Sequence, residues 1–146
     1  MKVLVIIILI LFGGLFLEMV KRKIHRHKLL RINKGRNKLS KEEFVQHFVT
    51  KGYNKDRISI MYDEIMLPIE LNDFVLLPKD DLHKICDLHD LDDIELIGRI
   101  CNKLCIEYPS PTNFDSISNK YDYLNFEYLL ELMRWSDETG QSFYQS

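Results

Sequence analysis

Chemically active side chains are most concentrated in residues 79–95, KDDLHKICDLHDLDDIE. This segment combines carboxylates with two imidazoles and one thiol, from His83, His89 and Cys86. All three kinds of group bind metals, but the spacing matches no closed zinc pattern, and no glycine stands where a calcium loop needs its sharp turn. We therefore expect neither a metal nor a cofactor.

Nucleophilic catalysis has little support in the same residues. Cys86 could pair with His83 or His89 as a thiolate, but closeness in sequence is weak support for such a pair. The chain has no glycine-flanked serine between a strand and a helix, and no glycine-rich phosphate loop. We expect Cys86, Cys101 and Cys105 to be reduced core residues, and the protein not to be an enzyme.

The charge of the chain is divided along the sequence. Residues 21–38 hold nine Lys or Arg and no acid. Residues 39–146 hold ten Lys or Arg and 21 Asp or Glu, a net charge of −11. An acidic body argues against nucleic acid as a partner.

An apolar run precedes the basic stretch. Residues 3–17 contain no polar side chain, and the run continues to Val20 with one acid, Glu18. About eighteen helical residues span roughly 27 Å, close to the thickness of a membrane core. The run lacks a small-residue cleavage site, which favours an uncleaved anchor over a signal peptide. We therefore predict a transmembrane helix over residues 1–20, with the basic side in the cytoplasm.

Residues 21–38 are expected to be a juxtamembrane linker. The protein would then be a single-pass protein of the inner (cytoplasmic) membrane, with its C-terminal domain in the cytoplasm. Each cation near an anionic headgroup contributes on the order of 1 kcal/mol. The alternative is that the basic stretch only sets the topology. The residues expected to bind lipid are Lys21, Arg22, Lys23, Arg26, Lys28 and Arg31.

The body, residues 39–140, shows helical signals, and residues 141–146 are expected to be a loose tail. Ser40 and Glu43 have the spacing of a capping box. Asn54 and Asp90 are candidate N-caps of two more helices, and a last helix is expected from about Asn125 to Trp135. The residues expected to face the core are Phe44, Val45, Phe48 and Val49, then Ile58, Met61, Tyr62 and Ile65, then Ile94, Ile97, Cys101 and Leu104, and finally Phe126, Leu129, Leu130 and Met133.

The fold class that these signals indicate is all-α, a small four-helix bundle behind the transmembrane helix. Residues 69–77 read as either a short strand or an ordered loop, because periodicity does not separate the two. Aromatic residues are frequent near the C-terminus. They could form an interface patch, but we favour the alternative that some lie in the core and others at its rim. They are Tyr121, Tyr123, Phe126, Tyr128 and Trp135.

Residues 88–109, LHDLDDIELIGRICNKLCIEYP, resemble the second-helix region of acyl carrier proteins and of an uncharacterised bacterial family of carrier-like domains. The matching positions are Leu91, Asp92, Ile94, Glu95 and Leu96, with an acidic-to-proline exit at residues 105–109. The resemblance implies a carrier-like helical fold with an acidic recognition helix. Asp90 stands where the carriers have the serine that takes phosphopantetheine, and His89 replaces the aspartate before it, so no acyl chemistry is implied.

The sequence thus predicts a membrane-tethered, non-enzymatic, acyl-carrier-like interaction module that binds a basic protein partner. The alternative is an immunity or regulatory protein that blocks a toxin or an enzyme. A simpler interpretation of the acids is that they keep the surface soluble. The residues expected to bind the partner are Asp87, Asp90, Asp92, Asp93 and Glu95.

Overall fold

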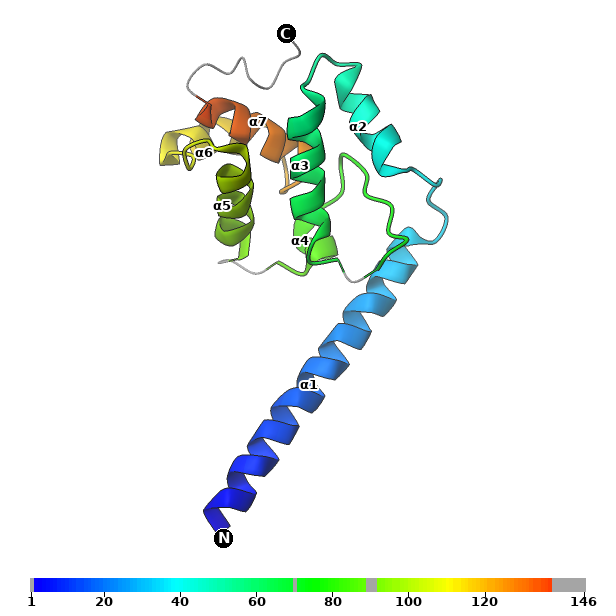
Figure 1. Cartoon of the computed structure of the whole chain (residues 1–146), viewed down its shortest axis with the longest axis vertical. Coiled ribbons are helices and arrows are strands. Elements are labelled where there is room, and N and C mark those ends of the chain that lie inside the picture. Colours follow the sequence, from blue (N-terminus) through cyan, green and yellow to red (C-terminus); the bar gives the residue numbers. More distant parts are fainter. Residues whose placement is uncertain (1, 70, 89–91, 138–146) are drawn as a thin grey trace. The chain divides into compact units, whose positions relative to one another are not determined.

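The computed structural model describes residues 2–69, 71–88 and 92–137, with side chains from residue 12 onward (Figure 1). Across these ranges the chain is helical and contains no strand, which confirms the all-α prediction. The chain divides into two compact units, Met1–Arg36 and Asn37–Ser146. Each unit is described by itself below.

The first unit is one helix, α1 (Lys2–Asn33). No helix within the described residues is long and apolar enough to cross a membrane, so the predicted transmembrane helix is not present there. From Phe12 onward the helix carries Glu18 and then the closely spaced basic residues of positions 21–31, which interrupt any apolar stretch. The part of that prediction on residues 1–11 lies outside the described side chains. Residues 21–33, predicted as a linker, are helical instead.

The second unit begins with two capped helices. Ser40 and Glu43 form the predicted capping box at the start of α2 (Lys41–Val49), with Ser40 N donating to Glu43 Oε2 at 2.7 Å. Asn54 caps α3 (Lys55–Met66) through bonds from two backbone amides. Both capping predictions are confirmed, because a side-chain oxygen satisfies amides that have no partner within the helix.

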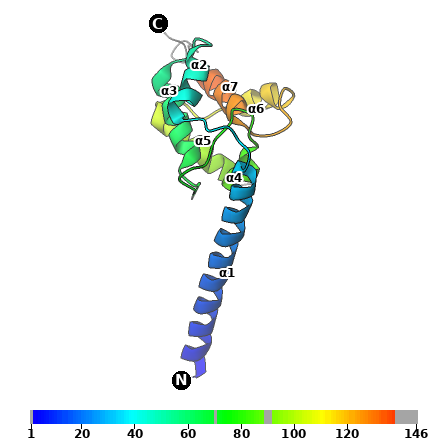
Figure 2. The ribbon, with the colours of Figure 1, turned by 90° about the vertical axis from the view of Figure 1, so that its right-hand side faces the viewer.

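The core lies between α2, α3, α5 (Asp92–Leu104) and α7 (Phe126–Ser136). Helix α3 packs beside α2 and α5, and the two ribbon views show this arrangement (Figures 1 and 2). Three fully buried rings meet at the centre, with Phe126 centroids 4.9 Å from Phe44 and 4.8 Å from Phe48. Burying such aromatic residues contributes strongly to stability.

Two short helices within the described second unit correct the four-helix prediction: α4 (Leu82–Cys86) and α6 (Pro111–Ser118). A helix of five residues, such as α4, is too short to show periodicity in the sequence. Pro111 occupies the start of α6 behind the Ser110 cap, where the missing amide costs nothing. Within the described residues, the body therefore contains six helices rather than the four predicted.

Residues 69–77 form an ordered loop, apart from position 70, which is not described. Ile69, Leu71 and Phe74 are buried, so the loop covers part of the core. The strand that was the alternative interpretation of this segment is absent from the described positions.

Candidate functional site

The predicted partner-binding residues lie in two places. Asp87 follows α4 in a left-handed conformation, with φ of 53°, whereas Asp92, Asp93 and Glu95 occupy the first turn of α5. Carboxylates at a helix start interact favourably with the helix dipole. Asp90, the predicted cap and the position of the carrier serine, lies outside the described residues.

Asp93 is bound to a histidine from α4. His83 Nε2 lies 2.6 Å from Asp93 Oδ2, and His83 Nδ1 lies 3.8 Å from Asp81 Oδ1. Asp81 in turn pairs with Lys84 at 2.8 Å. Although partial burial opposes it, the hydrogen bonds from Lys84 hold the pKa of Asp81 below its ordinary value. Helices α4 and α5 are thus joined by a polar chain, and Asp93 is not the fully solvated acid that the sequence suggested.

Glu95 keeps most of its side chain in solvent. It is 71% exposed, and it meets Arg99 one turn later at 3.3 Å. Arg99 also contacts Glu64 on α3, again at 3.3 Å, and so ties α3 to α5. An exposed pair of this kind contributes little to stability, which leaves Glu95 available to a partner.

Beside the first turn of α5 is a groove of about 360 Å³, lined by residues from α4, α5, α6, α7 and the connecting segments. We call it the aromatic groove, because five of its lining residues are the rings of Tyr108, Phe114, Tyr121, Tyr123 and Tyr128. Two ring pairs form within it: Tyr108 with Phe114, at 6.2 Å between centroids, and Tyr121 with Tyr128, at 5.7 Å. His83 and Asp93 also line the groove.

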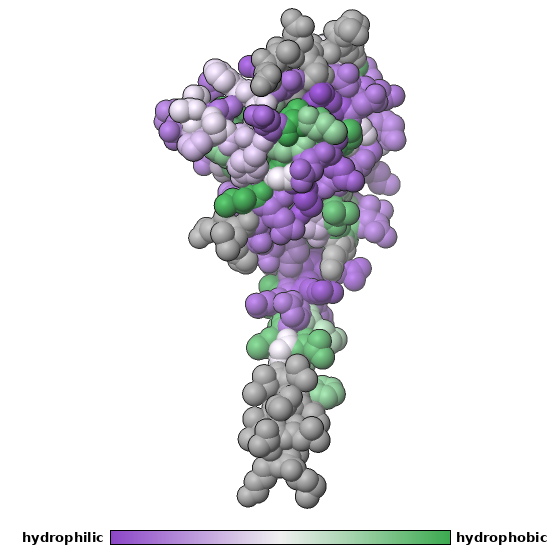
Figure 3. All heavy atoms as spheres, turned by 60° about the vertical axis from the view of Figure 1, so that its left-hand side comes forward, coloured by the Kyte–Doolittle hydropathy of each residue, from purple (hydrophilic) through white to green (hydrophobic). Residues whose placement is uncertain are grey.

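Ile94 corrects one of the core predictions. Ile97, Cys101 and Leu104 are buried as expected, but Ile94 is 54% exposed and lines the aromatic groove. The buried stripe of α5 runs instead through Leu96, Ile97 and Ile100. Tyr108 and Tyr123 are also well exposed, at 46% and 41%. The space-filling view brings forward the side where α5, α6 and α7 lie, and there hydrophobic residues form small patches among hydrophilic ones (Figure 3).

One oxygen of Asp93 has no hydrogen bond. Its Oδ1 is buried and has no partner, whereas Oδ2 is the atom that contacts His83. Burial raises the pKa of both Tyr108 and Tyr128; the charge of Asp93 adds to this for Tyr128, and the charges of Cys101 and then Asp93 add to it for Tyr108. A buried oxygen without a donor costs free energy, and such an atom needs an explanation.

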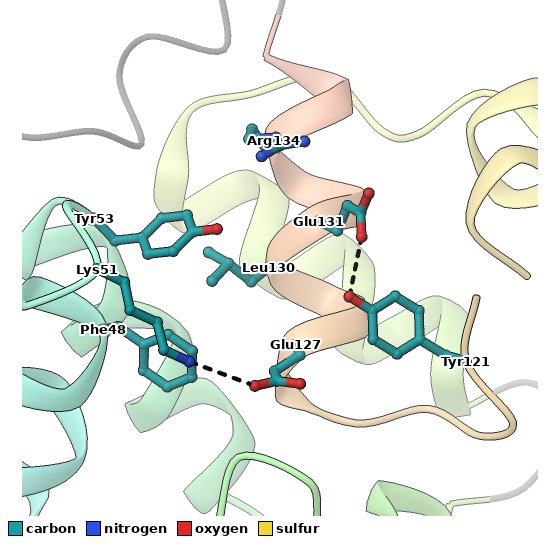
Figure 4. Close-up of a pocket in the computed structure, with 8 residues that line it drawn as sticks. All are labelled: Phe48, Lys51, Tyr53, Tyr121, Glu127, Leu130, Glu131 and Arg134. Atoms are coloured by element: carbon teal, nitrogen blue, oxygen red, sulfur yellow. Dashed lines mark hydrogen bonds and ion pairs between the residues drawn. The ribbon is translucent and has the colours of Figure 1, made fainter.

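A second hollow, of about 170 Å³, lies between residues 48–53 and α7 (Figure 4). We call it the polar pocket. Lys51 contacts Glu127 at 3.7 Å, and the Tyr121 hydroxyl donates to Glu131 at 3.0 Å. Although burial opposes it, hydrogen bonds from Lys120 and Tyr121 hold the pKa of Glu131 below its ordinary value. Burial and the bond to Glu131 raise the pKa of Tyr121 to about 12.

Two of the three thiols are buried. Burial raises the pKa of Cys86 to about 12 and that of Cys101 to about 11, so both stay protonated at neutral pH. Cys86 donates to the Ile65 carbonyl rather than pairing with His83. Cys105 is exposed, which corrects the expectation that all three are core residues.

The described residues contain no group of three or more His, Cys, Asp or Glu placed to hold a metal ion. His89, the other imidazole of residues 79–95, lies outside the described residues. In the first unit, the six predicted lipid-binding cations are all exposed on α1: Lys21, Arg22, Lys23, Arg26, Lys28 and Arg31.

The aromatic residues near the C-terminus divide, as expected, into buried core positions and exposed rim positions. Phe126 is fully buried, whereas Tyr123 and Trp135 are exposed. The sequence did not reveal that Tyr108 and Phe114 join three of these tyrosines in one groove. Their separation along the chain hides this, because they come together only through the turn between α6 and α7.

Comparisons with protein-family models, with curated proteins and with solved structures find no match. The resemblance to acyl carrier proteins therefore stays a prediction.

Proposed function

We propose that the second unit is a non-enzymatic module that binds a basic protein partner through the first turn of α5 and the aromatic groove beside it. The observation that carries this proposal is the exposure of Ile94, Tyr108 and Tyr123 around a groove that also contains Asp93. Exposed apolar and aromatic side chains around a hollow, with charged groups nearby, are typical of protein-binding surfaces.

The charge of the body supports a basic partner. Residues 39–146 carry a net charge of −11, and Asp92 and Glu95 lie in the same turn as Asp93. Complementary charge mainly increases the association rate and sets the orientation, whereas the apolar contacts supply the affinity. We therefore assign steering to the carboxylates and anchoring to the groove.

The side chains of the described body favour binding over catalysis. The two buried thiols have raised pKa values, and Glu131 and Glu127 are occupied by partners within the chain. The imidazole of His83 is hydrogen-bonded to Asp93, and this contact joins α4 to α5. None of these groups is prepared as a nucleophile.

Partner capture tests the proposal. The full chain, immobilised and exposed to a cell extract at low salt, should retain a protein rich in Lys and Arg. Asp92→Lys combined with Glu95→Lys should abolish that capture, and so should raising the salt to about 0.5 M, where the screening length is only a few ångströms.

A matched variant controls for net charge. Glu42→Lys with Asp56→Lys makes the same charge change in the first turns of α2 and α3, where both acids are exposed. This control should retain capture. Equal loss in both variants would show an effect of total charge alone, and capture that survives the α5 reversal would reject the proposal.

We also propose that the six exposed cations of α1 bind anionic lipid headgroups. Each contributes on the order of 1 kcal/mol near such a surface, and the contribution falls with salt. The full chain should sediment with vesicles of mixed phosphatidylcholine and phosphatidylglycerol more strongly than with phosphatidylcholine alone.

Replacing the six residues by glutamine should remove that difference between the two kinds of vesicle. The difference between the two kinds of vesicle measures the contribution of charge to binding, because apolar contacts contribute to both. Equal sedimentation of the unmodified chain with both vesicles would reject lipid binding by these cations. The residues concerned are Lys21, Arg22, Lys23, Arg26, Lys28 and Arg31.

A further inference from the structure

We propose that the aromatic groove binds an arginine side chain of the basic partner, with Asp93 as its counter-ion. This inference rests on the proposed function and specifies the contact at its centre. It starts from the buried Asp93 Oδ1, which has no donor while His83 contacts Oδ2. An apolar side chain in the groove would leave that oxygen without a hydrogen bond, whereas a guanidinium would supply one.

The rings of the groove suit a cation. Tyrosine and phenylalanine faces attract positive charge, and here five rings line the same groove as one carboxylate. Tyr108 with Phe114 and Tyr121 with Tyr128 give two ring pairs within the groove. Guanidinium fits such a site better than ammonium, because it is planar, stacks on rings and offers several donors.

The groove has room for this contact and a means of adjusting to it. Its volume of about 360 Å³ lies near the lower end of ligand sites, at roughly 300–1,000 Å³. Tyr108 and Tyr123 lie in segments between helices and are 46% and 41% exposed. Their side chains can adjust to a ligand without displacing a helix, although Tyr123 must then release the hydrogen bond from its hydroxyl to the Lys79 carbonyl.

The helix dipole opposes a cation at this end of α5. The positive end of the dipole amounts to about half a unit charge. Three carboxylates in the first turn, those of Asp92, Asp93 and Glu95, outweigh it. His83 partly satisfies Asp93 but leaves one oxygen, so the local charge still favours a positive ligand.

The test uses two short peptides and the full chain with isotope-labelled tyrosine rings. The peptides are acetyl-Gly-Arg-Gly-amide and the same peptide with citrulline, which has the shape of arginine without its charge. Nuclear magnetic resonance should show saturable shifts of Tyr108, Tyr123 and Tyr128 with the arginine peptide. The citrulline peptide should bind about tenfold more weakly or less, a difference of about 1.4 kcal/mol.

Asp93→Asn should lower the affinity for the arginine peptide by about tenfold, because it removes the charge while keeping the shape of the side chain. The matched control is Glu42→Gln, which removes an exposed charge from the first turn of α2, at a residue that does not line the groove. It should change the affinity by less than roughly threefold, since an exposed charge acts weakly through water. Unchanged dispersion of the ring signals would verify that both variants are folded.

Three results would overturn the inference: no saturable shift with arginine, equal binding of the two peptides, or equal effects of the two variants. Its failure is distinguishable from failure of the proposed function. If the α5 reversal abolishes partner capture while the two peptides bind equally, the acidic surface binds the partner without an arginine in the groove. If arginine binds but capture survives the reversal, the groove is a cation site outside the partner interface.

Discussion

The aromatic groove and the polar pocket share Tyr121 but differ in how their carboxylates are satisfied. In the polar pocket, Glu131 accepts from Tyr121 and Lys120, and Glu127 meets Lys51. In the aromatic groove, Asp93 has one oxygen bonded to His83 and one buried without a donor. Two hollows that share a side chain can thus have different roles, and the difference lies in whether the chain completes the hydrogen bonds.

This comparison assigns stability to the polar pocket and binding to the aromatic groove. A pocket whose charges are paired holds its walls together, and filling it with a ligand would break those pairs. A groove with an unsatisfied acceptor and exposed rings gains from a ligand that supplies a donor. Substitutions on the two sides should therefore affect different measurements.

The largest expected effect is on stability, from Glu131→Leu. This change removes the acceptor for both Tyr121 and Lys120, and it should lower the free energy of unfolding by about 2–3 kcal/mol. Chemical denaturation of the full chain measures it. Capture of the partner per folded molecule should stay unchanged, and a loss of capture at full folding would break the assignment.

Acid should weaken the same interaction in the unmodified chain. The pKa of Glu131 is lower in the folded state than its ordinary value of 4.5. Its contribution to stability is therefore present above that value and is lost as the pH falls through the folded-state pKa. Glu131→Leu should unfold with a shallower dependence on pH in this range, and an unchanged dependence would contradict the role of Glu131.

Ile94→Ser should affect binding rather than stability. Ile94 is 54% exposed, so the free energy of unfolding should change by no more than about 0.5 kcal/mol. Affinity for the captured partner should fall about tenfold, because an apolar anchor beside the groove is lost. A calorimetric titration with the purified partner measures this. If stability falls instead and affinity does not, Ile94 belongs to the core after all.

The smallest effect is expected from Tyr121→Phe, which sharpens the comparison because Tyr121 lines both hollows. The ring remains for the aromatic groove, whereas the hydrogen bond to Glu131 is lost at a cost of about 1 kcal/mol in stability. Partner affinity should therefore change by less than roughly twofold. A large loss of affinity would show that the hydroxyl also takes part in binding.

The alkaline behaviour of that variant has a defined sign. The pKa of Tyr121 is raised from 10.0 to about 12 in the folded state, so its contribution to stability is present below pH 10.0 and is lost as the pH rises toward about 12. Tyr121→Phe should lose less stability over this range. Burial also raises the pKa values of Cys86 and Cys101. Both thiols are present in the variant and in the unmodified chain, so they do not affect the comparison.

The sequence predicts best where local chemistry decides the structure. The capping box at Ser40 and the Asn54 cap could be predicted directly, since each depends on residues three positions apart or fewer. The buried faces of α3 and α7 follow from helical periodicity, and all eight residues predicted there are buried.

Prediction failed where long-range packing decides. Ile94 fits the periodic stripe of α5, but the stripe that is buried lies to one side of it, and periodicity alone does not show which side the neighbouring helices cover. The aromatic groove could not be derived, because residues from position 83 to position 128 line it. The pairing of Asp93 with His83 joins α5 to α4, and the sequence does not show that these two helices lie together.

The most direct test of the account maps which hollow meets the partner. A photoreactive benzoylphenylalanine is placed at position 94, beside the aromatic groove, or at position 53, which lines the polar pocket. After capture of the partner and illumination, covalent products are identified by mass spectrometry. The account predicts crosslinks to the basic partner from position 94 and none from position 53. Crosslinks from position 53 alone, or from neither position while the partner is still captured, would contradict it.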